Sequence, residues 1–363
     1  MRNLASIRQI KDKRPIENAD RIEVCTVDGW EVVVKKDEFN IDDLIIYIEI
    51  DSIVPDIPCF EFLRDRGFKV KTIKLRKQIS QGLIMPLSIL PEGLYTKGQD
   101  VTDILGIIKY ESNSEREANK TAYVSTSPLF KKFMKYKMFR KLIGDKYLKH
   151  KKHQKLFPDW IKKTDETRVQ NLPERFYQNI RSYYLFNVTE KLDGQSATYA
   201  VKKKLFGPEY FVCSRNIRLQ KHDSSSYWTI SDKHDIKAVL SDIMKNKDCR
   251  NVVLQGEIIG NGIQGNKYNK LFYDFYAFNL IIDGYQYSTN EMAFILEDYG
   301  IKTVPIVKRR YQLPQTISEL VKYATDKSVV NPKINREGLV LRWDEISFKV
   351  INPEFLLKES AND

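Results

Sequence analysis

The sequence predicts an α+β fold, in which a small all-β module precedes a larger part where antiparallel strands and helices alternate. Two observations lead to this prediction. Short alternating apolar runs bounded by turns fill residues 1–105, and longer strand and helix patterns share residues 158–363. The length of 363 residues is enough for two or three domains that each bury a core.

The first module has the strand spacing of a small barrel. A turn at Asp28-Gly29 joins two of its strands. The expected strands are Arg21–Val27, Trp30–Val34, Leu44–Ile50, Phe68–Leu75 and Gly82–Leu87. Five or six short strands in about 100 residues favour an oligonucleotide-binding (OB)-like β-barrel over residues 1–105.

One of these strands carries a series of basic side chains. The positions are Lys69, Lys71, Lys74, Arg76 and Lys77. They suit a face that follows the phosphates of a nucleic acid. They equally suit an edge strand that lysines protect from pairing with other chains.

The composition is that of a globular protein without a membrane span. Apolar residues make up 42% and charged residues 30% of the chain, and no run of 18 apolar residues occurs. The first residues have no apolar region typical of a secretory signal. The four cysteines and four histidines form no disulfide or zinc pattern. We therefore expect an intracellular protein, in the cytoplasm or nucleus, that is not secreted.

The net charge of +12 is concentrated in one segment. Residues 131–155 hold eleven Lys or Arg against a single acid, Asp145, and so carry +10. Such an excess predicts a polyanionic partner, with a solvated helix face as the alternative. Residues 106–157 are expected to form a basic helical linker whose short amphipathic helices end at Gly144.

The second part, residues 158–363, alternates strands and helices. We expect one helix to begin at Thr164 or Asp165, and two more helices at Lys233–Asn246 and Met292–Asp298. The expected strands are Tyr183–Val188, Ala197–Val201, Val252–Gly260, Lys270–Ile282, Glu337–Arg342 and Ser347–Ile351.

A short motif, Lys191-Leu192-Asp193-Gly194, follows the first of these strands. A partly desolvated lysine has a lowered pKa and can act as a nucleophile. Asp193 could orient it, and Gly194 could leave room for a ligand near the backbone. The motif is short, and a surface lysine in a hairpin would look the same.

Five separated runs strengthen the reading of Lys191 as a nucleophile. They are Lys191–Gly194, Ser214–Asn216, Glu257–Gly260, Phe275–Leu280, and Glu337–Val340 with Lys349. In this order they resemble the motifs of covalent nucleotidyltransferases, the superfamily of ATP-dependent ligases and mRNA capping enzymes. Residues 164–170 and the β-rich module in front are similar to RNA ligases with an N-terminal OB domain. This resemblance covers nearly the whole chain and implies an adenylyltransferase (ATP-grasp-like ligase) domain of antiparallel sheets with flanking helices.

The resemblance implies a set of site residues. The implied catalytic residues are Lys191, Lys349 and Asp193, and the implied metal ligand is Glu337, which would hold Mg²⁺ or Mn²⁺. The implied nucleotide-binding residues are Arg168, Gln170, Glu190, Lys191, Arg215, Glu257 and Phe278. The cofactor would be ATP, with AMP bound covalently. Burial and nearby cations would favour the neutral, nucleophilic form of Lys191.

Each residue type suits its implied role. Arg215 can form a fork onto a phosphate, Glu257 can accept a hydrogen bond from a ribose hydroxyl, and Phe278 offers a flat face to adenine. Phe275 points to the other side of the strand and is expected in the core. For Arg168 and Gln170, a capping or packing role is equally open.

Two positions depart from the family pattern. Ser347 stands where a second lysine often precedes Lys349, so part of the charge stabilisation would come from elsewhere, for example Arg342. Asn279 stands where aspartate is usual, and we expect it to be structural.

The implied function is that of an ATP-dependent RNA ligase that seals 5′-phosphate and 3′-hydroxyl ends in RNA repair. Alternatives are a capping guanylyltransferase, a DNA ligase, or an inactive nucleic-acid-binding protein. The first two usually carry a second barrel after the last motif, whereas 14 residues follow Lys349 here. RNA or a nicked duplex is the expected partner, no membrane is expected, and we expect a monomer.

Overall fold

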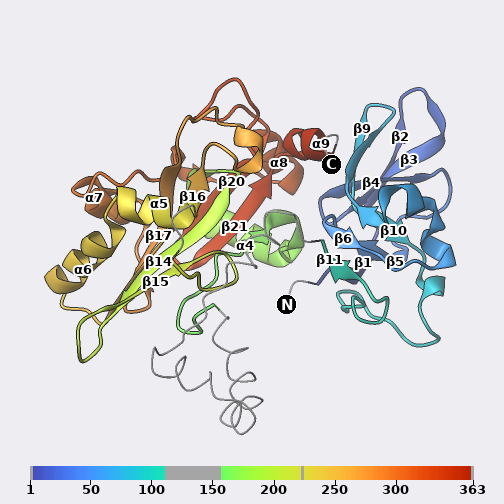
Figure 1. Cartoon of the computed structure of the whole chain (residues 1–363). Helices are drawn as coiled ribbons and strands as arrows, with labels where there is room; N and C mark the ends of the chain where they lie inside the picture. Colours follow the sequence, from blue (N-terminus) through green and yellow to red (C-terminus); the bar gives the residue numbers. More distant parts are fainter. Residues whose placement is uncertain (1–2, 111–156, 222–224, 361–363) are drawn as a thin grey trace, which may run out of the picture.

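The computed structural model describes residues 3–110, 157–221 and 225–360. It confirms the α+β class, with a small β-rich part at the N-terminal end and a larger mixed part after it (Figure 1). The basic segment 131–155 and the helices expected there lie outside the described residues.

The N-terminal part is a barrel of short strands whose pairings in the described residues are antiparallel. Its sheets have the orders β1-β5-β10, β2-β3-β4, β8-β9 and β11-β6-β7. The strands are β1 (Ala5–Gln9), β2 (Asp12–Ile16), β3 (Ala19–Val27), β4 (Trp30–Lys35), β5 (Leu44–Ile48), β6 (Ser52–Ile53), β7 (Lys69–Val70), β8 (Thr72–Leu75), β9 (Gln78–Gln81), β10 (Leu83–Met85) and β11 (Ile108–Lys109), with 3₁₀ helices η1 (Pro58–Arg66) and η2 (Leu87–Ile89).

The expected turn at Asp28-Gly29 is present, because both residues have positive φ, 47° and 87°. This conformation matches the twist of the two strands that it joins. Two details differ from the expectation. The strand expected at 68–75 is divided at Lys71 into β7 and β8, and β11 pairs with β6 beyond the boundary expected at residue 105.

The larger part contains two five-stranded sheets, of order β12-β21-β20-β13-β19 and β15-β14-β16-β17-β18. Their strands are β12 (Thr167–Arg168), β13 (Leu185–Lys191), β14 (Gln195–Lys202), β15 (Glu209–Cys213), β16 (Asn251–Ile259), β17 (Asp274–Ile282), β18 (Tyr285–Gln286), β19 (Ile306–Gln312), β20 (Gly338–Trp343) and β21 (Ile346–Ile351). All named pairings within them are antiparallel except that between β12 and β21.

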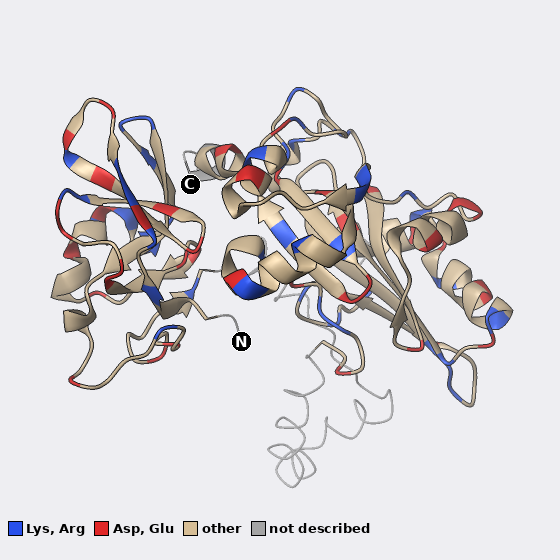
Figure 2. Cartoon of the chain, turned by 180° about the vertical axis from the view of Figure 1, so that it is seen from behind, with Lys and Arg blue, Asp and Glu red and all other residues tan. Residues whose placement is uncertain are grey.

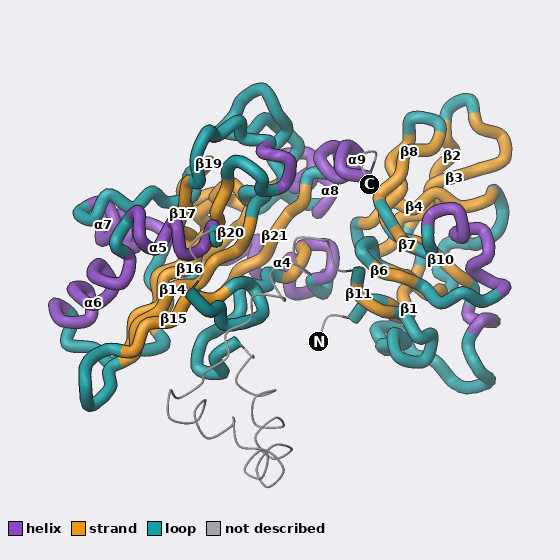
Figure 3. Tube along the Cα trace, viewed as in Figure 1, coloured by secondary structure: helices purple, strands orange, loops and turns teal. Residues whose placement is uncertain are grey.

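Helices cover the outer faces of these sheets (Figure 3). They are α4 (Glu174–Tyr183), α5 (Ser226–Lys233), α6 (Ile236–Asn246), α7 (Thr289–Glu297) and α8 (Ile317–Ala324). The last helix, α9 (Pro353–Ser360), instead packs against β8 of the barrel, and the 3₁₀ helices η3 (Val169–Asn171) and η4 (Gln264–Asn266) lie in connections. One core joins α5, α6 and α7 to the second sheet, and another joins α4 and α8 to the first. Among the described residues, no helix is long and apolar enough to cross a membrane.

Three sequence predictions of secondary structure in this part are wrong. The helix expected to begin at Thr164 or Asp165 begins at Glu174, because the chain first pairs with β21 through β12. The helix expected at 233–246 is two helices, separated where Asp235 adopts a left-handed conformation with φ of 43°. The strand expected from Lys270 begins at Asp274.

Residues 168–171, from the end of β12 through η3, join the two parts of the molecule. Arg168 donates to Asp51 of the barrel at 2.9 Å, and Asn171 donates to Glu49 at 2.5 Å. The indole N–H of Trp30 in turn donates to Asn171 at 3.3 Å. The barrel is thereby held against the sheet that carries Lys191.

Candidate active site

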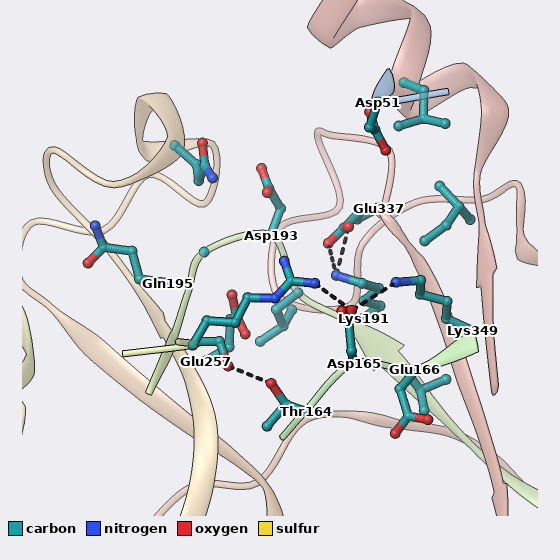
Figure 4. Close-up of a pocket in the computed structure, with 18 of the residues that line it drawn as sticks. Asp51, Thr164, Asp165, Glu166, Lys191, Asp193, Gln195, Glu257, Glu337 and Lys349 are labelled. Atoms are coloured by element: carbon teal, nitrogen blue, oxygen red, sulfur yellow. Dashed lines mark hydrogen bonds and ion pairs between the residues drawn. The ribbon is translucent and has the colours of Figure 1, made fainter. Parts of the chain in front are cut away.

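A cavity of about 820 Å³ lies where the two five-stranded sheets meet the barrel. Lys191 lies on its wall beside the other residues labelled in Figure 4. Most of the residues predicted from the sequence line this cavity: Arg168, Glu190, Lys191, Asp193, Arg215, Glu257, Phe278, Glu337 and Lys349. The structure therefore brings together motifs that are up to about 180 residues apart in the sequence.

Strand pairing places Lys191 beside Glu337. Lys191 is the last residue of β13 and pairs with Gly338, the first residue of β20. Glu337 immediately precedes that strand, and the Lys191 Nζ donates to its carboxylate at 2.7 Å (Figure 4). The antiparallel register alone is sufficient to bring the predicted nucleophile to the predicted metal ligand.

The charge state of Lys191 differs from the expectation. Burial lowers the pKa of its ammonium, but the carboxylates of Glu337, Glu257 and Asp193 outweigh burial and raise that pKa above its usual value. Lys191 is thus protonated in this arrangement. Burial, together with the charges of Glu337 and Asp193, raises the pKa of Glu257 to about 8.

Asp193 is held by residues from the connection between β16 and β17. Its carboxylate accepts from the Lys267 Nζ at 2.5 Å, and its backbone N–H donates to the Tyr268 hydroxyl at 2.8 Å. Gly194 is required for a different reason from the one expected. A Cβ there would collide with the Ile258 carbonyl of β16, so the close neighbour is a strand rather than a ligand.

Arg215 and Lys349 converge on one carboxylate, that of Asp165. The Arg215 Nη2 donates to it at 2.5 Å, and the Lys349 Nζ lies 3.8 Å away (Figure 4). Burial opposes the charge of Asp165, yet the two cations lower its pKa below the usual value. Burial, with the positive charges of Arg168, Lys191 and Arg215, lowers the pKa of Lys349 to about 7.

Arg168 and Gln170 have different surroundings. Arg168 pairs with Lys349 across the parallel β12–β21 contact, is 7% exposed, and lines the cavity. Gln170 is 2% exposed and packs near Gly29 of the barrel, outside the cavity lining. For Gln170 the structure supports the packing role, because a side chain in that place does not reach the site.

Glu190 lies deep beside the cavity. Its Oε2 accepts from the backbone N–H of Val329 at 2.7 Å, and burial raises the pKa of its carboxyl group. The carboxyl group therefore holds the 328–330 loop.

Phe278 is half-buried and lines the cavity, whereas Phe275 is 1% exposed and packs on Tyr199 in the core, as expected from strand alternation. Arg342 donates to the Phe278 carbonyl at 2.9 Å and to Glu166 at 3.0 Å, which fixes the aromatic wall. Asn279 is structural, since it donates to Gln255 at 2.8 Å.

Sequence reasoning missed several residues around the site. Lys267 and Tyr268 could have been noticed only by knowing that the β16–β17 connection returns to Asp193. Arg336 is 3% exposed and donates to the carbonyls of Ala324 and Tyr323 at the end of α8, which anchors the residue next to Glu337. Buried arginines are rare, but the sequence does not show burial.

The barrel contributes cations to the same cavity. Lys69 of β7 and Lys71, which lies between β7 and β8, line it together with Lys109 of β11. Lys69 also lies over the Tyr110 ring at 4.3 Å. These two members of the basic series are therefore half-buried, whereas Lys74 is exposed.

The carboxylates fit a divalent cation only if a ligand shares its coordination. Within the described residues, no group of three or more His, Cys, Asp or Glu side chains is placed to hold a metal ion alone. Burial raises the pKa of Glu257 most, and the neighbouring negative charges of Glu337 and Asp193 raise it further, so these three carboxylates repel one another. A cation held by one or two carboxylates together with substrate phosphates would relieve that repulsion, which is the usual arrangement for Mg²⁺.

Comparison with known proteins agrees with this geometry. An OB-fold domain model matches residues 4–87, and an RNA ligase model matches residues 185–358. A Naegleria gruberi RNA ligase solved with pyrophosphate is 30% identical, with a TM-score of 0.80 over 99% of this chain and 100% of that chain. The chain belongs to the RNA ligase family.

Two further structures show what that relative binds. A variant of the Naegleria gruberi ligase solved with ATP and manganese is 30% identical, with a TM-score of 0.79 over 98% of this chain and 99% of that one. Another variant, solved with AMP and manganese, is 31% identical, with a TM-score of 0.78 over the same shares. No curated protein matched the chain. The predicted fold and family are confirmed, and RNA ligase, rather than a capping enzyme or DNA ligase, is the function that these matches support.

Proposed function

We propose that this ATP-dependent RNA ligase joins a 5′-phosphate end to a 3′-hydroxyl end through AMP linked to Lys191. The observation that carries the proposal is the convergence of Lys191, Glu337, Arg215 and Lys349 on one cavity beside Phe278. A nucleophile, a carboxylate, two phosphate-binding cations and a flat aromatic face are what an adenylyl transfer needs.

Lys191 must lose its proton before it attacks. In the structure the Glu337 carboxylate holds the ammonium at 2.7 Å and raises its pKa. Mg²⁺ or Mn²⁺, held by Glu337, would supply positive charge that offsets this carboxylate and the phosphates. The pair Lys191–Glu337 must then separate, so that the neutral amine can face the α-phosphate.

The phosphate contacts follow from the charges. Arg215 and Lys349 now share Asp165, and we expect nucleotide phosphates to compete with that carboxylate for them. Lys191 forms a bond from its nitrogen to the α-phosphorus, and pyrophosphate leaves with the electrons of the broken P–O bond. Lys349 stabilises the charge that develops on the phosphate oxygens.

The later steps reuse the same groups. The 5′-phosphate of RNA takes AMP from Lys191, and the 3′-hydroxyl then attacks that phosphate as AMP leaves. Lys69, Lys71 and Lys109 line the side of the cavity formed by the barrel, where they can hold RNA phosphates. In this proposal residues 1–105 together with β11 form the RNA-binding barrel, a basic linker follows up to residue 157, and residues 158–363 form the adenylyltransferase domain.

Labelling tests the proposal. The protein is incubated with α-³²P-ATP or α-³²P-GTP and a divalent cation, then denatured. We expect label from ATP that survives denaturation and alkali but is released by acid, as a phosphoramidate is, with no label from GTP and none in the Lys191→Ala variant. Lys308→Ala is the matched control, because Lys308 is exposed on β19 of the same sheet. Label that persists in Lys191→Ala, or comes from GTP alone, would contradict the proposal.

A further inference from the structure

Two large apolar side chains project into solvent beside the active site. Leu271 is 84% exposed and Phe272 is 78% exposed, at the end of the connection between β16 and β17. We refer to them as the Leu271–Phe272 pair. Adjacent exposed apolar side chains of this size are typical of interaction surfaces.

The backbone that presents the pair is tightly fixed. The Asn266 side chain accepts from the Lys270 N–H at 2.9 Å and donates to the Lys270 carbonyl at 3.0 Å. Gly260 has φ of 145°, and a Cβ there would lie 2.7 Å from the Phe272 carbonyl oxygen. The Lys233 Nζ donates to the Tyr273 carbonyl at 3.0 Å. Because the backbone is held on both sides of the pair, its exposure is a property of the fold.

Positive charge surrounds the pair. Lys302 donates to Asp274 at 2.8 Å, and the Lys270 Nζ lies 3.7 Å from the same carboxylate. Lys233, whose Nζ donates to the Tyr273 carbonyl, adds a third lysine beside the pair. Acidic and basic residues are otherwise interspersed over both parts of the molecule (Figure 2). An apolar platform among lysines is complementary to a single-stranded nucleic acid, whose bases stack and whose phosphates pair.

The same connection reaches the nucleophile motif. Lys267 and Tyr268 hold Asp193, as described above, and Gln264, Gly265 and Lys267 line the cavity. The pair is only four or five residues further along the chain. An RNA strand seated on the pair would therefore have its reactive end within reach of the cavity.

We propose that the Leu271–Phe272 pair is a stacking platform for a nucleobase of the RNA next to the joint, with Lys233, Lys270 and Lys302 on the phosphates of that strand. The inference rests on the proposed function. It assigns the pair to the two RNA-dependent steps and leaves the reaction of Lys191 with ATP unaffected. A second copy of this chain fits the surface poorly, since each copy carries +12.

The chain contains a matched control. The tripeptide Lys-Leu-Phe occurs at 270–272 and again at 204–206, where Leu205 is 96% exposed and Phe206 is 103% exposed. That hairpin joins β14 to β15 at the opposite end of the sheet from the β16–β17 connection. The same double substitution can therefore be compared at a site near the cavity and at a site far from it.

The test compares Leu271→Ser/Phe272→Ser with Leu205→Ser/Phe206→Ser in the full chain. We measure labelling by α-³²P-ATP, binding of a fluorescent single-stranded 5′-phosphorylated RNA by anisotropy, and sealing of that RNA to a 3′-hydroxyl RNA end. The 271/272 variant should label at the wild-type rate but lose between about 5-fold and 100-fold in RNA affinity, with a matching loss in sealing. The 205/206 variant should match the wild type, and Phe272→Trp should retain most of the affinity because it keeps a flat face.

Three outcomes would overturn the inference. The first is unchanged RNA affinity and sealing in the 271/272 variant. The second is labelling that falls in parallel with sealing, because the substitution would then act on Asp193 rather than on RNA. The third is a change in molecular mass by light scattering with RNA affinity unaltered, which would make the pair a contact between copies. If the 271/272 variant fails to fold, Phe272→Ala and Phe272→Trp are compared by the same measurements. Failure of the wild type to label would instead refute the proposed function.

Discussion

Replacing Lys349 by methionine should make the folded protein more stable while it removes ligase activity. In the absence of nucleotide the Lys349 side chain is 15% exposed, and burial with the charges of Arg168, Lys191 and Arg215 lowers its pKa from 10.5 to about 7. The unfolded chain keeps the proton over this range. Above pH 7 it therefore binds more protons than the folded chain does, and the stability due to Lys349 rises as the pH increases toward 10.

The magnitude follows from the two pKa values. A lysine whose pKa falls from 10.5 to about 7 destabilises the folded state by roughly 4 kcal/mol at pH 7. Methionine has a similar length and no charge, but Asp165 loses the cation 3.8 Å away. We therefore expect a net gain of about 2 kcal/mol, or about 4 to 8 °C in Tm.

The assay is thermal unfolding without nucleotide at pH 6.5, 8.0 and 9.5. The difference between Lys349→Met and the wild type should be largest at pH 6.5 and small at pH 9.5, and Lys308→Met on the exposed face of β19 should show no such trend. A variant that melts at or below the wild-type temperature at pH 6.5, or a difference that does not change with pH, would refute the reasoning.

Three other substitutions test separate parts of the site. Asp165→Asn removes a carboxylate whose charge raises the pKa of Lys349. That pKa should therefore fall, and the alkaline limb of the pH profile of kcat/KM for adenylylation should move to lower pH. A shift to higher pH would contradict this. Gly194→Ala should lower the free energy of unfolding, measured by urea denaturation, by about 2 kcal/mol, because its Cβ meets a strand carbonyl. Gly93→Ala, whose Cβ meets only Tyr95 at 3.6 Å, should not. Arg342→Met removes the hydrogen bonds to the Phe278 carbonyl and Glu166, and should raise the KM for ATP about 10-fold; a change confined to kcat would point away from nucleotide positioning.

The motif spacing predicted the centre of the site because chemistry restricts the residue type there. Lys191, Arg215, Glu257, Glu337 and Lys349 line one cavity, as the resemblance implied. The antiparallel strands that hold them were also visible, because their apolar patterns are strong. The pattern could not predict whether the pKa of Lys191 is raised or lowered. Burial lowers this pKa, but several nearby carboxylates outweigh burial and raise it.

The predictions from sequence were wrong where a contact between distant segments overrode the structure that the local residues favour. Thr164 and Asp165 look like a helix start, but the chain continues into β12, which pairs with β21 from Thr167 on. The Asp165 carboxylate is held by Arg215 and Lys349. Gln170 packs near Gly29 of the barrel, so its position is set by the contact between the two parts of the molecule. A contact between segments 20 to 180 residues apart leaves no mark in the local sequence, so the roles of Lys267 and Tyr268 could not be predicted.

Ser347 stands where related sequences often have a second lysine, and here too a contact between distant segments decides the charge of the site. Positions 347 and 349 face the same side of β21, so a lysine at 347 would have added its charge beside Lys349. In the described part of the chain the Ser347 hydroxyl is buried without a hydrogen-bond partner, so it contributes no charge of its own. The neighbouring cation is instead Arg168, which β12 places opposite Lys349 and which Asp51 of the barrel holds at 2.9 Å.

The positive charge beside Lys349 comes from Arg168 of β12 and not from a lysine of β21. Its position therefore depends on different contacts. A lysine at 347 would depend only on the hairpin that carries Lys349. Arg168 depends on the contact between β12 and the barrel, because Asp51 is the carboxylate that fixes its guanidinium. The positive potential at the phosphate-binding end of the cavity is therefore assembled from both parts of the molecule, and the position of the barrel bears directly on the charge that Lys349 experiences.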